Sequence, residues 1–215
     1  ISCVWYTLCI EQMFGGGAMS RSRDYAVRCP KCGSIMPFEL FDSITSSLNP
    51  ELRQQILDDR FETVVCPDCK AVSYIQYDIL YHDPARRFMV CVGTDYSDVF
   101  QQSDCPAGYK LRYVDDYKQL AEKIRIFEAG LNDGIMEITK EAMRHMAKRN
   151  LELYYAGSRR KLMFFTVPGQ EKHVAVSQGL YTLAGKYYDR IPMEEDRGFL
   201  RINQKYAEAL KKIEV

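Results

Sequence analysis

The sequence contains no run of 18 or more apolar residues, so we expect no segment of it to span a membrane as a helix. It also lacks a glycine-rich loop that ends in Lys-Ser/Thr, and it lacks a serine in a nucleophile-elbow motif. The commonest signatures of phosphate binding and of hydrolysis are therefore missing. The apolar residues 1–10 have no basic segment before them and make a poor signal peptide. We predict a cytoplasmic protein.

The chain carries no net charge, with 29 Lys and Arg against 29 Asp and Glu, but the charges are unevenly distributed. Residues 19–104 contain 9 basic and 13 acidic side chains, whereas residues 105–215 contain 20 basic and 15 acidic ones. Because phosphate contacts dominate the affinity for nucleic acids, the acidic part is a poor candidate for binding them. Any such contact is expected from basic residues of the second part. These residues are Lys148, Arg149, Arg159, Arg160 and Lys161.

Turn-forming residues divide the chain into three predicted regions. We interpret residues 1–18, which end in Gly-Gly-Gly-Ala before Met19, as a leader or a non-native extension. Residues 19–104 are predicted to form a first domain, and residues 105–215 are predicted to form a helical and mixed α/β region. Strands and helices do not alternate regularly along the chain, which indicates an α+β fold.

Alternating apolar residues and turn signals predict the elements of the first domain. A helix is expected at residues 50–60, because Asn49 is a good N-cap and Pro50 suits the first helical position. The expected strands are residues 24–28, 35–41, 61–65, 75–81 and 87–92. The strand at 75–81 should be half-buried, because Ile and Tyr alternate there with Gln and Asp.

Two amphipathic helices are predicted to open the second region. The first should bury Leu120, Ile124, Phe127 and Leu131. The second should bury Ile135, Ile138, Ala142 and Met146. The remaining expected elements are strands at 151–155, 161–167, 173–176 and 199–202 and helices that begin at Ser177 and Gln204.

Four of the eight cysteines lie in two Cys-Pro-x-Cys tetrapeptides. Two thiolates separated by two residues can bind one metal ion from a tight turn, and two such turns complete a tetrahedral zinc site. We predict one structural zinc ion per chain, with the ligands Cys29, Cys32, Cys66 and Cys69. Because sulfur fills all four positions, no position is left for a reactive water, and a catalytic zinc is not expected.

Redox chemistry and an iron–sulfur site are the competing interpretations of these cysteines. A redox Cys-x-x-Cys motif usually lies at a helix N-terminus, whereas strands are expected around both pairs here. The 33 residues between the pairs exceed the usual interval of a zinc ribbon, and the predicted helix at 50–60 accounts for the excess. We therefore predict a zinc-ribbon-like domain with a helical insertion. Lys70 follows the second pair where Gly33 follows the first, and this departure could distort the second turn.

The amino-acid sequence around the cysteines resembles that of a known family. The two Cys-Pro-x-Cys turns, the segment SITSSLNPELRQQIL between them and LYHDPARRFMV after them are similar to the CpXC proteins across residues 19–92. The segment KIRIFEAGLNDGIMEI also resembles the part that follows the core domain in that family. The resemblance implies a bacterial protein that starts at Met19 and whose four cysteines bind zinc. It implies no reaction.

Other reactive side chains give weaker signals. His82 lies beside Asp83 and could act as a general base, although a turn-capping role is the commoner one for such a pair. Cys91 lies in an apolar segment and is expected in the core. The other cysteines and histidines have no partners at the spacing of a metal site. They are Cys3, Cys9, Cys105, His145 and His173.

The function favoured by the sequence is a zinc-stabilised binding or scaffolding protein that acts on another protein or on a second copy of itself. Fifteen tyrosines support an interaction surface, because tyrosine is favoured at interfaces. Nucleic-acid binding through the basic second region is the alternative. An enzyme with a site near His82 is a further alternative.

Overall fold

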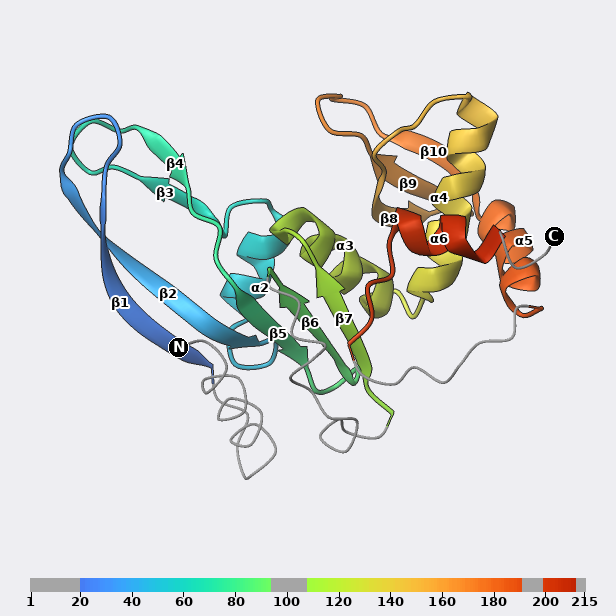
Figure 1. Cartoon of the computed structure of the whole chain (residues 1–215), viewed down its shortest axis with the longest axis horizontal. Coiled ribbons are helices and arrows are strands. Elements are labelled where there is room, and N and C mark those ends of the chain that lie inside the picture. Colours follow the sequence, from blue (N-terminus) through green and yellow to red (C-terminus); the bar gives the residue numbers. More distant parts are fainter. Residues whose placement is uncertain (1–19, 94–107, 191–198, 212–215) are drawn as a thin grey trace. The chain divides into compact units, whose positions relative to one another are not determined.

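The computed structural model describes residues 20–93, 108–190 and 199–211, and it divides into two compact units, residues 1–120 and 121–215 (Figure 1). Both units combine helices with strands, which confirms the α+β class. The predicted leader, the predicted boundary between residues 104 and 105, and Cys3, Cys9 and Cys105 lie outside the described residues. Those assignments stay predictions.

The first unit is built on a five-stranded sheet in the order β1-β2-β5-β6-β7. The strands are β1 (Arg21–Arg28), β2 (Ile35–Thr45), β5 (Ile79–Asp83), β6 (Phe88–Val92) and β7 (Lys110–Val114). Every residue of the central strands β5 and β6 is buried. Helix α2 (Pro50–Leu57) buries Leu52 and Ile56. The predicted strands at 24–28, 35–41 and 87–92 and the predicted helix are therefore confirmed within a few residues.

Two ribbons extend from this sheet. Strand β2 is 11 residues long, but only its residues 43–45 pair with β5, so its earlier residues pair with β1 alone. Strands β3 (Thr63–Val65) and β4 (Val72–Tyr74) form a second antiparallel pair that joins no other strand among the described residues. Figure 1 shows both ribbons reaching away from β5 and β6 toward the same side.

Aromatic side chains pack where the ribbons meet the sheet. The ring of Phe61 lies 5.2 Å from that of Tyr117 and 6.1 Å from that of Tyr77. The Tyr117 hydroxyl, at the start of helix α3 (Tyr117–Glu128), donates a hydrogen bond to the Tyr77 carbonyl at 2.7 Å. The predicted strand at 75–81 is therefore wrong at residues 75–78, because Tyr77 is held by this cluster and pairing begins only at Ile79.

The second unit combines helices with a small antiparallel sheet in the order β10-β9-β8. The strands are β8 (Tyr154–Arg159), β9 (Leu162–Thr166) and β10 (Val174–Ser177). The helices are α4 (Asp133–Ala147), α5 (Gln178–Tyr188) and α6 (Gln204–Lys211), after the end of α3. Ser177 caps α5 as predicted, because its side chain accepts a hydrogen bond from the Gly179 N–H. The predicted strand at 199–202 is wrong, since those residues form only an isolated bridge at Leu200.

The buried face of α4 differs from the predicted one. Met146 is 71% exposed, and Ile135, Ile138 and Ala142 are only half-buried. The buried residues include five with polar or charged side chains, namely Asp133, Glu137, Thr139, Lys140 and Arg144. Apolar periodicity gave the wrong face because this helix buries charges that find partners inside the unit. In α3 the predicted residues Leu120, Ile124 and Phe127 are buried, as expected.

Candidate metal centre

Each predicted cysteine pair lies in the turn at the end of one ribbon. Cys29 and Cys32 lie between β1 and β2, and Cys66 and Cys69 lie between β3 and β4. We call these two turns the first and second knuckle. The strands on both sides of each knuckle confirm the predicted setting and differ from the strand-to-helix setting of a redox motif.

The first knuckle is closed by two backbone hydrogen bonds. The Cys29 N–H donates to the Ser34 carbonyl at 2.8 Å, and the Gly33 N–H donates to the Cys29 carbonyl at 2.9 Å. Gly33 has φ of 78°, a left-handed conformation that glycine adopts without steric cost. The chain therefore reverses tightly enough to point Cys29 and Cys32 to the same side.

The second knuckle repeats this geometry without a glycine. The Cys66 N–H donates to the Ala71 carbonyl at 2.9 Å, and the Lys70 N–H donates to the Cys66 carbonyl at 3.0 Å. Lys70 takes the left-handed conformation, with φ of 56°, and its Nζ donates to the Pro67 carbonyl at 2.8 Å. The lysine therefore does not distort the turn.

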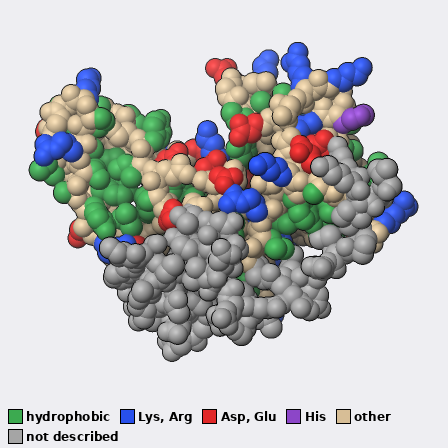
Figure 2. Space-filling view, viewed as in Figure 1, with side chains coloured by type: hydrophobic (Ala, Val, Ile, Leu, Met, Phe, Trp, Pro, Cys, Tyr) green, Lys and Arg blue, Asp and Glu red, His purple; other side chains and the backbone are tan. Residues whose placement is uncertain are grey.

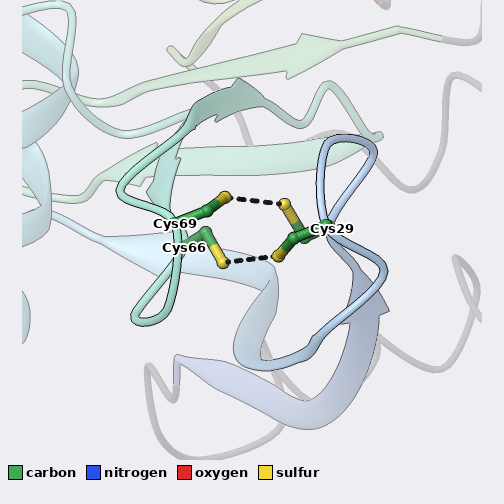
Figure 3. A group of neighbouring side chains, drawn as sticks. Cys29, Cys66 and Cys69 are labelled. Carbon is green, nitrogen blue, oxygen red and sulfur yellow. Dashed lines mark hydrogen bonds between the residues drawn. The ribbon is translucent and has the colours of Figure 1, made fainter.

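The two knuckles bring four sulfur atoms together, as Figure 3 shows. All four Sγ atoms of Cys29, Cys32, Cys66 and Cys69 lie within 4.8 Å of one another. The distance is 3.6 Å from Cys29 to Cys69 and 3.6 Å from Cys32 to Cys66, so each short contact joins the two ribbons. A tetrahedron with zinc–sulfur bonds of about 2.3 Å has edges of about 3.8 Å. A disulfide needs about 2.05 Å, so the geometry fits a shared metal ion and does not fit a disulfide.

Local hydrogen bonds favour the ionised form of two thiols, against the opposing effect of burial. The Ser34 hydroxyl and backbone N–H lower the pKa of Cys32 to about 6. The backbone N–H groups of Cys32 and Lys31 lower the pKa of Cys29. The thiolate is the form that binds metal. For Cys69 the Ala71 backbone lowers the pKa, but burial and the neighbouring thiols outweigh it and raise that pKa to about 12. Four adjacent thiols need a cation before all of them can ionise.

The sulfur atoms lie on a small apolar cluster. Cys29, Cys66 and Met36 are almost fully buried in it, whereas Cys32 is exposed. The half-buried side chains of Val27, Val64, Cys69 and Ala71 complete the cluster. Three buried residues form a very small core, so the ribbons depend on contacts at the cysteines.

His82 is buried in β5. Its Nε2 lies 3.2 Å from the Tyr109 hydroxyl, and burial lowers its pKa. The neighbouring Asp83 carboxylate bonds instead to Arg86, at 3.0 Å to the backbone N–H and 2.9 Å to the guanidinium. Asp83 therefore stabilises the turn between β5 and β6, which is the capping role expected from the sequence. Cys91 is fully buried in β6, as predicted.

The basic residues singled out in the sequence do not form one cluster. Arg160 and Lys161 make the turn between β8 and β9, whereas Lys148 and Arg149 precede the start of β8. Strand β8 therefore separates these two pairs along the chain. His145 and His173 are exposed.

An exposed apolar face on the second ribbon was not anticipated. Val65 and Val72 are cross-strand partners and are 53% and 54% exposed, and Tyr74 on the same face is 72% exposed. Their neighbours Val64 and Ala71 turn inward to the cysteines. Hydrophobic side chains gather over the ribbons in Figure 2. The alternation around the second knuckle could have shown this face, because every second residue of a strand points the same way.

Comparison with known proteins gives one match. Residues 27–140 match the family model described as CpXC protein, and this segment includes both knuckles and most of α4. No curated protein and no solved structure matches the chain. Among the described residues, no helix has both the length and the apolar character needed to cross a membrane.

Proposed function

The chain belongs to the CpXC protein family, and from this premise we propose that its two knuckles hold one structural zinc ion in a zinc-ribbon-like arrangement. The observation that carries the proposal is the cluster of four Sγ atoms within 4.8 Å, contributed by the turns of two separate ribbons. Zinc accepts four thiolates in a closed tetrahedral site, and such sites stabilise folds. A site built from reduced thiols suits the cytoplasm, where disulfides are rare.

Metal analysis and X-ray absorption test this proposal directly. We expect one zinc ion per chain with four sulfur neighbours at about 2.3 Å. Cys69→Ser should lower the zinc content or replace one sulfur by a lighter ligand. Cys91→Ala is the matched control, because Cys91 lies in β6 and outside the cluster, and it should keep one zinc. A nitrogen ligand in the native protein, or the visible absorption of an iron–sulfur cluster, would show the proposal to be wrong.

We further propose that the protein is a non-catalytic binding or scaffolding module whose ribbons contact another protein or a second copy of the chain. The exposed Val65, Val72 and Tyr74 support this role. Neither β3 nor β4 carries a charged residue or a proline, the usual means of protecting an exposed edge strand. The ribbon is therefore suited to contact with another polypeptide.

Nucleic-acid binding is the competing class, and the structure gives a reason to expect it to be weak. The basic residues come from two separate segments, one before β8 and one in the turn between β8 and β9. We expect affinity for generic RNA or DNA no tighter than about 10⁻⁵ M at physiological salt, as for non-specific binding. Fluorescence anisotropy over a salt series measures it. A sub-micromolar, salt-sensitive complex that is lost in a triple Arg159→Ala, Arg160→Ala, Lys161→Ala variant would instead favour a nucleic-acid-binding protein.

A further inference from the structure

A network of buried charges connects α3 and α4 in the second unit. Lys123 Nζ lies 2.8 Å from an Asp133 carboxylate oxygen and donates a second bond, of 2.7 Å, to the Ile202 carbonyl. Lys140 Nζ lies 3.1 and 3.0 Å from the two carboxylate oxygens of Glu122. The same ammonium lies 2.7 Å from Glu137 Oε1. The side chains of these five residues are at most 5% exposed.

The charges in this network do not balance if every group is ionised. Lys123 and Asp133 offset each other. Lys140 supplies one positive charge to two carboxylates, Glu122 and Glu137. Three carboxylates and two ammonium groups therefore sum to one negative charge among these five side chains. An uncompensated buried charge costs several kcal/mol, and a buried group commonly takes up a proton to avoid that cost.

The two carboxylates that share Lys140 differ in how many hydrogen-bond donors they contact. Glu122 accepts both bonds from Lys140 and a third, of 2.6 Å, from the Tyr155 N–H of β8. Glu137 receives one contact from Lys140, and its Oε2 is buried with no hydrogen-bond partner among the described residues. An ionised carboxylate needs donors at both oxygens, and Glu137 lacks them at one.

We propose that Glu137 holds a proton at neutral pH, so that the C-terminal unit contains a proton-binding site that responds to alkaline pH. This site is separate from the cysteine knuckles and does not rest on the proposed zinc. With the proton in place, the five groups sum to zero charge. Losing the proton would restore a negative charge beside Glu122 in a region that water does not reach.

The groups around Glu137 also favour its protonated form. Burial raises the pKa of Glu137 and so does Glu122, whereas Lys140 and Lys123 lower it, and the net direction is upward. Helix α5, which also packs against α4, brings the phenol rings of Tyr181 and Tyr188 beside Asn132 and Gly134. From α6, the described charged side chains Lys205 and Glu208 are exposed. Neither helix supplies a further buried cation to Glu137 within the described residues.

The sign of the pH effect follows from linkage. The folded state binds a proton that an unfolded glutamate, with an ordinary pKa of 4.5, releases. Stability from this proton is therefore fully present below pH 4.5 and is lost as the pH rises toward the folded pKa. Inside that window, each pH unit multiplies the unfolding equilibrium constant by up to about ten.

The test compares the full-length, zinc-loaded chain with its Glu137→Gln variant by urea unfolding between pH 5 and 9. Glutamine has the shape of the protonated acid and cannot titrate. The unfolding equilibrium constant of the variant should therefore rise less steeply with pH, by up to about a factor of ten less per pH unit. Glu141→Gln is the matched control on the same helix. Glu141 pairs with Arg144, which is not one of the five charged residues of the network, so its variant should keep the wild-type pH slope. Equal slopes for the wild-type protein and Glu137→Gln would overturn the proposal.

A measurement on the wild-type protein avoids any dependence on how the variant folds. With glutamate labelled at the carboxyl carbon, one resonance should stay at the position of the neutral acid at pH 7, while the others show ionised carboxylates. It should move only at higher pH. A spectrum in which every glutamate is ionised at pH 7 would refute the bound proton, whatever the variant shows.

Discussion

Replacing Cys66 with serine will unfold both ribbons while the C-terminal unit stays folded. Cys66 is fully buried, and its Sγ lies 3.6 Å from that of Cys32 in the other ribbon. A two-stranded ribbon is marginally stable alone, and only three residues are buried in the cluster beneath the knuckles. A structural zinc contributes about 10–16 kcal/mol of apparent binding free energy, which exceeds what such a cluster supplies.

Hydrogen exchange on the full chain measures this effect by region. We expect protection to be lost in β1, β3, β4 and the part of β2 before residue 43, and to persist in β8 and β9. The fully buried strands β5 and β6 have a core of their own and should lose less. Removing zinc from the wild-type protein with a chelator should give the same pattern. Native protection at both knuckles in the serine variant would show that metal does not hold the ribbons.

Replacing Lys140 with methionine will destabilise the C-terminal unit by about 3–5 kcal/mol, the usual cost of removing one partner of a buried ion pair. Methionine keeps the length of the side chain but removes the cation that contacts both Glu122 and Glu137. Two buried carboxyl groups then lose their main donor. Urea unfolding followed by circular dichroism gives the free energy of unfolding.

Two further variants separate this charge effect from a loss of packing. Lys186→Met changes an exposed lysine of α5 and should alter the free energy by less than about 0.5 kcal/mol. Adding Glu122→Gln and Glu137→Gln to Lys140→Met removes the unpaired charges and should restore much of the stability. If Lys140→Met alone lowers the free energy of unfolding by less than about 1 kcal/mol, the network contributes little to the stability of the C-terminal unit.

The cysteine cluster could be predicted from sequence because its geometry is local. Two residues between cysteines, with a turn that needs a left-handed residue at Gly33, nearly determine the direction of the sulfur atoms. The strands around the first knuckle and before the second followed from alternating, apolar and β-branched segments, whereas β4 was not predicted. That the two knuckles lie next to each other depends on the fold and cannot be read from either turn alone. The preference of zinc for four ligands indicated that they would meet.

Other features depended on long-range contacts that no local pattern records. Strand β7 was not predicted, because two of its five residues are basic, yet Arg112 is buried there and donates to the Leu111 carbonyl. The buried face of α4 was misassigned because periodicity analysis treats every charge as exposed. The spacing of Asp133, Glu137 and Lys140 on one helical face was the available signal. The parallel pairings of β2 with β5 and of β6 with β7 had no sequence signature.

The matching backbone geometry of the two knuckles bears on how a metal ion enters and leaves. Each knuckle offers two sulfur atoms from an equivalent turn, so either one can capture an ion first and the other then closes over it. Binding by the second knuckle is then intramolecular, and its equilibrium constant depends on the effective concentration of that knuckle's two thiolates near the ion. Strand β2 runs without interruption from the first knuckle into the central sheet and limits how far that knuckle can move. For a bound ion as proposed, release passes through a half-open state in which one knuckle still holds the ion, so a competing chelator has to act before the open knuckle recloses.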